Sequence, residues 1–421
     1  MPLILSRDRL RFLLSRIRER LWVKPLLICL LSILGVFSAR LTDAIPLVQH
    51  IAIIEADTIE TLLSIMASSM LVIATFAVAS MVSAYASASS TATPRSFSLV
   101  VADDVSQNAL STFIGAFIFS IVSLAAVKND YFEEAGRFTL FLLMALVFAL
   151  VIVTFVRWVD RIARLGRLGS TIDKVEQVTA EALIRRRNAP TLGGMPAATQ
   201  PVAGAPVYAT EVGYLQQVDI AALQAYAEQI QGRVAVMVLP GVFFTPSRAL
   251  AYVCTGSGVS ADGHHRQVTE AFQLGSTRLF DDDPRFGLVV LSEIASRALS
   301  PAVNDPGTAI DVIGRLVRLF VCWSRQTRGG DAEEPLYDRV SVPAISAHDM
   351  FDDAFTAIAR DGAGLVEVAV RLQKAFHALA MENDTDLRQA ARQHSRLALK
   401  RAQKAITLAA DRTRVRRAAR W

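Results

Sequence analysis

The side chains of this sequence that could do chemistry are hydroxyls spaced along one side of an apolar segment. The segment Ile59–Ser90 is long enough to cross a bilayer, yet small residues recur through it at close to helical spacing. These six residues, which we call the small-residue stripe, are Ser64, Ser68, Thr75, Ala79, Ser83 and Ala86. In hydrocarbon, small residues mark places where helix backbones approach closely, and hydroxyls mark interhelical hydrogen bonds or contact with water. The stripe therefore faces protein or a pore, and the sequence leaves both alternatives open.

Charged and polar side chains lie in the loops on both sides of this segment. Glu55, Asp57 and Glu60 precede it. In a ring of subunits they would form a negative outer mouth that concentrates cations, whereas the alternative is an outward loop that is merely solvated. The polar residues of the inward loop that could contact ions are Arg95, Asp103, Asp104 and Gln107. For Asp104 the commoner role is a helix N-terminal charge favoured by the dipole, and the other is ion coordination.

The patterns typical of common enzyme classes are absent from the sequence. It contains no G-x-S-x-G, P-loop, dinucleotide fingerprint or H-E-x-x-H motif, so we predict neither a catalytic residue nor a cofactor. His264 and His265 lack a Cys or carboxylate at ligand spacing, and Asp281–Asp283 lack the alternate spacing of a calcium loop. We interpret the histidines as surface residues and the three acids as a helix cap. The sequence thus predicts no metal site.

The elements that must position these groups are predominantly membrane helices. Of the 421 residues, 52% are hydrophobic and the mean hydropathy is +0.36, which is too apolar for an ordinary soluble enzyme. Four apolar segments approach the roughly 20 residues needed to cross the hydrocarbon core. They are Trp22–Ser38, Ile59–Tyr85, Leu110–Val127 and Phe138–Val156. We expect the first to be a span rather than a cleaved signal peptide, because more spans follow it.

Arginine is clustered at the flanks of these segments. It is dense before the first and after the fourth, whereas residues 41–58 contain no Lys or Arg, so the positive-inside rule places both termini in the cytoplasm. Residues 1–21 are predicted to be a basic amphipathic arm, and the Arg-rich tail ends in Trp421. Both are expected to contact anionic lipid head groups rather than nucleic acid. For the arm, a solvated segment that only sets topology is the alternative.

Beyond a transmembrane domain at 22–158, we predict a linker helix with a Pro/Gly/Ala-rich linker at 159–206, in which the fourth span continues as a helix to Arg187. A cytosolic α+β domain at 207–330 and C-terminal helices at 331–421 follow. The predicted strands are Gly213–Val218, Arg233–Val238, Arg248–Cys254 and Val268–Leu274, with a helix at Ile220–Gln231 capped by Asp219. The other predicted helices are Phe286–Leu299, one beginning at Pro306, Asp349–Ala380 and Asp384–Arg420.

Three stretches carry a resemblance to a known family. They are Thr93–Arg95 continuing through Asp104, Gln107, Phe113, Gly115 and Phe117; Arg233–Val253; and IASRALSPAVNDPGTA, Ile294–Ala309. They resemble predicted bacterial membrane proteins catalogued as a domain of unknown function (DUF2254). The resemblance implies a four-span inner-membrane protein with a cytosolic domain, and it assigns no activity or ligand.

One departure from the family pattern is Thr245–Arg248, which lacks the Gly expected before Leu250. The polar and turn-forming residues of the third stretch, which we call the cytosolic motif, are Arg297, Ser300, Pro301, Asn304, Asp305 and Pro306.

These observations favour an oligomeric ion channel. Several copies of the segment that carries the stripe would line the pore, and the cytosolic domain would govern opening. A preference for cations is indicated only by the acidic loops. Ionisable groups are nearly absent from the spans, which disfavours a proton-coupled transporter. The alternative is a non-conducting membrane scaffold or sensor whose cytosolic domain binds a partner or small ligand.

Overall fold

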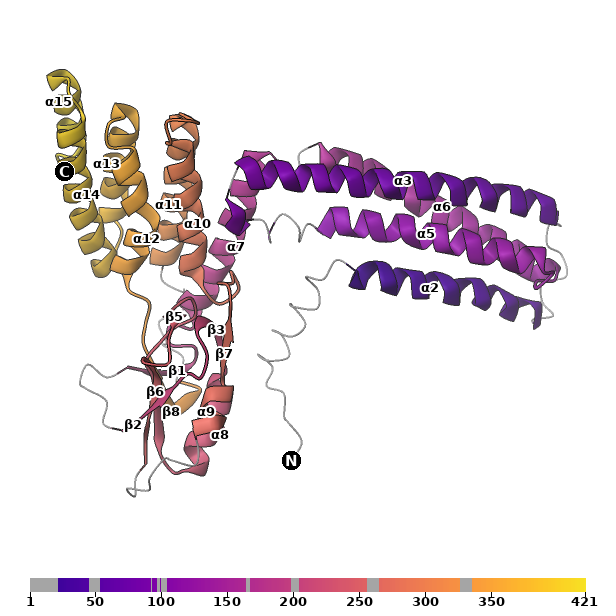
Figure 1. Cartoon of the computed structure of the whole chain (residues 1–421), viewed down its shortest axis with the longest axis horizontal. Coiled ribbons are helices and arrows are strands. Elements are labelled where there is room, and N and C mark those ends of the chain that lie inside the picture. The colour runs from indigo at the N-terminus through magenta and orange to yellow at the C-terminus, as the bar shows by residue number, and fades with distance from the viewer. Residues whose placement is uncertain are drawn as a thin grey trace. The chain divides into compact units, whose positions relative to one another are not determined.

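The structure is a computed structural model, and it describes residues 22–44, 54–91, 93–96, 99, 104–163, 167–197, 204–255, 265–325 and 335–421. Contacts between residues divide the described chain into two compact units that join between Thr171 and Ile172 (Figure 1). We call them the apolar unit, 22–171, and the C-terminal unit, 172–421. The predicted basic arm at 1–21 and Asp103 lie outside the described residues.

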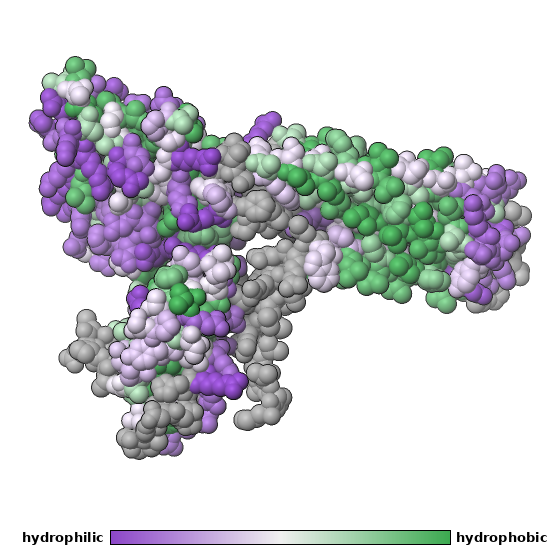
Figure 2. All heavy atoms as spheres, viewed as in Figure 1, coloured by the Kyte–Doolittle hydropathy of each residue, from purple (hydrophilic) through white to green (hydrophobic). Residues whose placement is uncertain are grey.

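The apolar unit contains the four predicted apolar helices. They are α2 (Val23–Ala39), which continues into the short helix η1 (Arg40–Ala44), α3 (Ala56–Thr91), α5 (Asp104–Lys128) and α6 (Glu134–Ile162). Each is long and apolar enough to cross a membrane. Figure 2 shows apolar residues over most of the visible face of this unit, with hydrophilic residues gathered at one end. A surface this apolar is stable only against lipid or another protein.

The central helix of the apolar unit is α5, which packs against α2, α3 and α6. Its small residues permit close approach, because a Cβ at Gly115 would lie 2.4 Å from Cγ2 of Ile28 in α2. Ser111 and Ser120 of α5 are fully buried, and each hydroxyl donates to a carbonyl one turn earlier in the same helix. In α5, therefore, small and hydroxyl residues serve packing within one subunit.

The N-terminus of α6 is capped by a carboxylate distant in sequence. Asp43 of η1 accepts hydrogen bonds from the backbone N–H of Gly136, at 2.6 Å, and of Glu133, at 3.2 Å. The first N–H groups of a helix have no partner within it, so a carboxylate placed there satisfies donors and matches the dipole. This contact fixes the end of η1 against the start of α6.

The C-terminal unit begins with α7 (Leu168–Asn188, of which the first four residues belong to the apolar unit) and two sheets. The five-stranded sheet has the order β1-β8-β4-β6-β2, and the three-stranded sheet has the order β5-β3-β7. The strands are β1 (Gly194–Pro196), β2 (Ala205–Tyr208), β3 (Gly213–Val218), β4 (Arg233–Val236), β5 (Phe243–Phe244), β6 (Ala249–Cys254), β7 (Phe272–Gly275) and β8 (Tyr337–Val342). Strand β4 is antiparallel to β6 and parallel to β8. The turn Thr245–Arg248 closes without the expected Gly, because the Arg248 N–H donates to the Thr245 carbonyl at 3.0 Å.

Helices complete this unit. α8 (Ile220–Gln229) follows β3, and Asp219 caps it as predicted by accepting from the Ala222 N–H. The helices of the remaining chain are α9 (His265–Glu270), α10 (Pro284–Ala298), α11 (Pro306–Ser324), α12 (Ala347–Asp361), α13 (Val366–Ala380), α14 (Thr385–Ala405) and α15 (Ala409–Ala418). α12 packs against α10 and α14, and α13 packs against α11 and α14. Phe320, Phe351, Phe355 and Phe376 from three of these helices form a fully buried aromatic cluster.

Several sequence predictions about element boundaries are wrong. Val268–Leu274 is not one strand but the end of α9 followed by β7. Asp349–Ala380 is two helices, α12 and α13, because the chain turns at Gly362, and Asp384–Arg420 is likewise α14 and α15. The fourth apolar helix does not continue to Arg187 but ends at Ile162, before Gly166. The strands β1, β2, β5 and β8 were not predicted.

Candidate functional site

The small-residue stripe lies along the exposed side of α3. All six of its residues, Ser64, Ser68, Thr75, Ala79, Ser83 and Ala86, are exposed. The opposite side of α3 is buried against the rest of the apolar unit, through residues such as Leu63, Met70 and Ala77. Large apolar side chains, including Ile65 and Val72, are exposed beside the stripe. The structure thus places the stripe on a surface available to lipid or to another chain.

Two hydroxyl groups of the stripe, those of Ser68 and Thr75, are oriented by their own helix. Ser68 Oγ lies 3.0 Å from the carbonyl oxygens of Ser64 and Ile65, and Thr75 Oγ1 donates to the Val72 carbonyl at 2.8 Å. Because these hydroxyl protons are directed at the backbone, the oxygen lone pairs are the groups left to interact with the surroundings. An oxygen presented in this way can accept a hydrogen bond or contact a cation.

An open depression lies at the C-terminal half of α3. It has a volume of about 430 Å³, and its lining residues are Ala79, Ser80, Ser83, Ala84, Ser87 and Ile162. Two of them, Ala79 and Ser83, belong to the stripe, and Ile162 is the last residue of α6. Its three serines, Ser80, Ser83 and Ser87, give this depression polar groups that a helix side facing only lipid does not need.

The predicted mouth and inner-loop residues are distributed around the ends of these helices. Glu55 and Asp57 are exposed and Glu60 is half-buried, all at the start of α3, where Asp57 in the first turn suits the helix dipole. On the inner loop, Arg95 is exposed and Gln107 is buried within α5. Asp104 is the first residue of α5, as its predicted role at a helix N-terminus requires.

The cytosolic motif forms a turn between α10 and α11. Asp305 is the N-cap of α11, accepting from the backbone N–H of Thr308 at 3.0 Å and from its hydroxyl at 2.6 Å. These hydrogen bonds lower the pKa of the Asp305 carboxyl. Asn304 has a φ of +49° and donates its N–H to the Ser300 carbonyl. The sequence left the cap open between these two residues, and the structure assigns it to Asp305. The other predicted residues of the motif also lie at this turn, with Arg297 in the last turn of α10, Ser300 and Pro301 following it, and Pro306 as the first residue of α11.

The acidic run before α10 is a structural cap, as predicted. Asp283 accepts from the Phe286 N–H at 3.2 Å and pairs with Arg278 at 2.7 Å. Its carboxyl is almost fully buried, and this burial raises its pKa despite the Arg278 contact. The backbone carbonyls of Asp281 and Asp282 accept hydrogen bonds from Arg185 and Arg186 at the end of α7. These two arginines therefore bind protein backbone.

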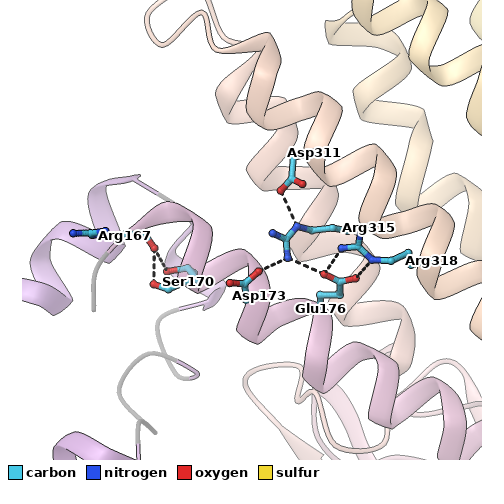
Figure 3. A network of polar contacts seen from close by, with 8 residues as sticks. Arg167, Ser170, Asp173, Glu176, Asp311, Arg315 and Arg318 are labelled. Carbon is cyan, nitrogen blue, oxygen red and sulfur yellow. Dashed lines mark hydrogen bonds and ion pairs between the residues drawn. The ribbon is translucent and has the colours of Figure 1, made fainter. Parts of the chain in front are cut away.

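A second contact joins α7 to α11 by ion pairs (Figure 3). Arg315 of α11 contacts Glu176 at 2.8 Å, Asp311 at 2.7 Å and also Asp173, and Arg318 contacts Glu176 at 2.8 Å. We call this group the α7–α11 clamp. Burial raises the pKa of Glu176, but the hydrogen bonds from the two guanidinium groups outweigh it and the net shift is downward. Sequence reasoning missed the clamp because Glu176 and Arg315 are far apart in the chain.

Within the described residues, the group whose atoms could hold a metal ion is His348, Asp352 and His394. His348 and Asp352 lie four residues apart on α12, whereas His394 comes from α14. The spacing of the first two was visible in the sequence, but which helix would bring the third was not. The prediction that the sequence contains no metal site did not consider this group.

Comparisons with known proteins identify a family of predicted membrane proteins. The family described as "Predicted membrane protein (DUF2254)" matches residues 18–378. Two uncharacterized proteins, one from Mycobacterium tuberculosis and one from Mycobacterium bovis, are 32% identical to this chain over 119 residues, which is 28% of this chain. The chain spans about a quarter of the length of those relatives, 23%. No solved structure matches the chain.

Proposed function

The chain belongs to the family described as predicted membrane protein (DUF2254), and on that premise we propose that it is an oligomeric ion channel. Copies of α3 would surround an axis, with the small-residue stripe toward the pore. The observation that supports this proposal is the exposure of all six stripe residues on the side of α3 opposite its buried side. In a channel, that exposed side is completed by other copies of the chain.

The proposed ion preference is for cations. The hydroxyl protons of Ser68 and Thr75 are donated to the backbone of α3, so around an axis these side chains would present oxygen lone pairs to the path. Rings of oxygen atoms replace water around cations and not around anions. Glu55 and Asp57, exposed at the start of α3, would add negative charge at one mouth.

We further propose that the C-terminal unit controls opening through α7. This helix begins in the apolar unit and is held in the C-terminal unit by the α7–α11 clamp. In this proposal, a movement of α11 acts on α7 through the clamp, and α7 in turn acts on the chain that follows α6. The protein would lie in a bacterial inner membrane with both termini in the cytoplasm, its Arg-rich termini on anionic lipid, and it would have no catalytic role.

Planar-bilayer recording of the purified protein tests the channel. Ser68→Leu and Ser83→Leu should each reduce single-channel conductance at least tenfold, because each places a bulky apolar group at the proposed path. Ser69→Leu is the matched control, since Ser69 is exposed on α3 but outside the stripe, and it should leave conductance unchanged. When the KCl concentration differs between the two sides of the bilayer, the reversal potential should lie near the equilibrium potential of K⁺. Absence of conductance in the unsubstituted protein would overturn the proposal.

A non-conducting scaffold or sensor is the second candidate. Its supporting observation is that Ser68 and Thr75 satisfy their hydroxyl donors within α3, so the stripe could pack against another helix without water. Under this proposal, Ser68→Leu and Ser83→Leu change the association state or the thermal stability of the protein, and reconstituted vesicles show no ion flux. Measuring both quantities on the same preparations separates the two candidates.

A further inference from the structure

Three side chains that sequence reasoning left unassigned meet between α12 and α14. His348 Nε2 lies 3.9 Å from Asp352 Oδ2, and His394 Nε2 lies 3.5 Å from Asp352 Oδ1. One ligand atom from each residue lies within 4.8 Å of the others. Ligands about 2.0–2.2 Å from a tetrahedral zinc ion are themselves about 3.4 Å apart, so small side-chain movements would bring these atoms into coordination.

The imidazole of His394 provides an independent indication of a ligand. Its side chain is 3% exposed, and Nε2 is buried without a hydrogen-bond partner in the described part of the chain. A buried polar atom that lacks a partner is costly, and native proteins seldom retain one without a compensating interaction. Nε2 is also the atom directed at Asp352. A bound ion at this point would satisfy it.

Neighbouring residues fix two of the three groups in place. The ring of His394 packs against Phe351 and Phe376, with ring centroids 5.5 and 6.2 Å away. Thr356, one turn beyond Asp352, donates its hydroxyl to Asp352 Oδ1 at 3.1 Å. Metal-binding carboxylates are commonly held by such outer hydrogen bonds. Arg401 is a nearby positive charge. Together with burial, it lowers the pKa of His394, and its guanidinium donates a hydrogen bond to the Thr356 carbonyl. Its charge would weaken cation binding.

We propose that His348, Asp352 and His394 bind a divalent transition-metal ion of the zinc class. Two imidazoles and one carboxylate are a donor set that suits Zn²⁺, whereas Ca²⁺ and Mg²⁺ prefer oxygen atoms alone. About half of the His348 and Asp352 side-chain surfaces is exposed, so water can complete the coordination. The ion would join α12 to α14. This inference does not depend on ion conduction by the apolar unit.

Binding of ZnCl₂ to the full chain in detergent, without an affinity tag and after treatment with chelator, tests the site. Isothermal titration should give one Zn²⁺ per chain, and CoCl₂ should give the visible absorption of four-coordinate Co²⁺. Because His348 and Asp352 are exposed, His348→Ala and Asp352→Asn are expected to fold, which circular dichroism checks. Each should weaken Zn²⁺ binding at least tenfold and remove the rise in unfolding temperature that Zn²⁺ causes. MgCl₂ and CaCl₂ should give neither signal.

His377→Ala is the matched control, because His377 is an exposed histidine of the neighbouring helix α13 and lies outside the group. It should bind Zn²⁺ like the unsubstituted chain. The inference is overturned when the unsubstituted chain binds no Zn²⁺. It is equally overturned when His348→Ala and Asp352→Asn retain its affinity, or when His377→Ala loses as much binding as they do.

Discussion

Single contacts at helix ends determine where small residues are required. At Gly136, a Cβ would lie 2.6 Å from Asp43 Oδ2, the carboxylate that caps α6. We expect Gly136→Ala to displace this carboxylate and to cost about 1 kcal/mol, the typical value of a lost cap. The measurement is the midpoint of thermal unfolding in detergent, which should fall by several degrees. Gly35→Ala in α2 is the control, since a Cβ there meets nothing within 4 Å, and an unfolding midpoint as low as that of Gly136→Ala would contradict the explanation.

The cytosolic motif contains a second residue whose role is conformational. Asn304 has a φ of +49°, a region that asparagine and glycine tolerate better than other residues. Asn304→Ala should therefore destabilise the protein by about 1 kcal/mol, whereas Asn304→Gly should be close to neutral. Urea unfolding followed by circular dichroism measures both. Equal losses in the two variants would show that the Asn304 side chain, rather than its backbone, is what the turn needs.

What the sequence could predict at this scale was the kind of residue, not its partner. Aspartates before Pro284 and Pro306 indicated helix caps, and Asp283 and Asp305 fill that role. Capping is local, so the sequence contains the whole interaction. Asp43 caps α6, which begins only at Glu134, and nothing local indicates it. His394 likewise meets α12 only because the two helices pack together.

At the scale of elements, the α7–α11 clamp joins two helices that are distant in sequence. The Arg315 and Glu176 side chains are both largely shielded from water, at 13% and 17% exposed. Because both side chains keep some contact with water, we expect a coupling free energy of about 1 kcal/mol in a double-mutant cycle of Arg315→Ala and Glu176→Gln. Denaturant unfolding of the four proteins measures it. Arg360→Ala breaks an exposed pair with the adjacent Asp361, so it should cause no measurable change, and additive effects of the two clamp substitutions would contradict the coupling.

Apolar periodicity predicted the elements that are long or strongly alternating. The four apolar helices and the strands β3, β4 and β6 were all visible in the sequence. Strand β8 was not predicted, although it pairs with β4, because Tyr337–Val342 mixes charged and apolar residues at the edge of a helical region. The division between α12 and α13 was missed because the apolar pattern continues across Gly362. Pairing partners and short breaks depend on the tertiary structure, which single-segment patterns do not contain.

At the scale of the whole molecule, the apolar unit exposes many large apolar side chains, a surface that is stable against lipid or another protein but not in water. The stripe on α3 combines small residues with exposure, whereas the small residues of α5 are buried within the subunit. Small residues let helices approach closely, so an exposed stripe on α3 suits contact with α3 of another copy. The sequence predicted that the stripe faces protein or a pore, and that stays a prediction, because the described chain shows only that the stripe is exposed on its own subunit.

Disulfide crosslinking tests the contact between copies directly. In a background with Cys29, Cys254 and Cys322 replaced by serine, Ser83→Cys should form crosslinked dimers when membranes are oxidised, because two Cα atoms must come within about 7 Å for the bond to form. Ala77→Cys is the control, since Ala77 is fully buried against its own subunit and should remain uncrosslinked. A result in which only Ala77→Cys crosslinks would show that copies associate through another side of α3. When Ser83→Cys is combined with Ser68→Cys, crosslinked species larger than the dimer should appear, because each copy in a ring has two neighbours.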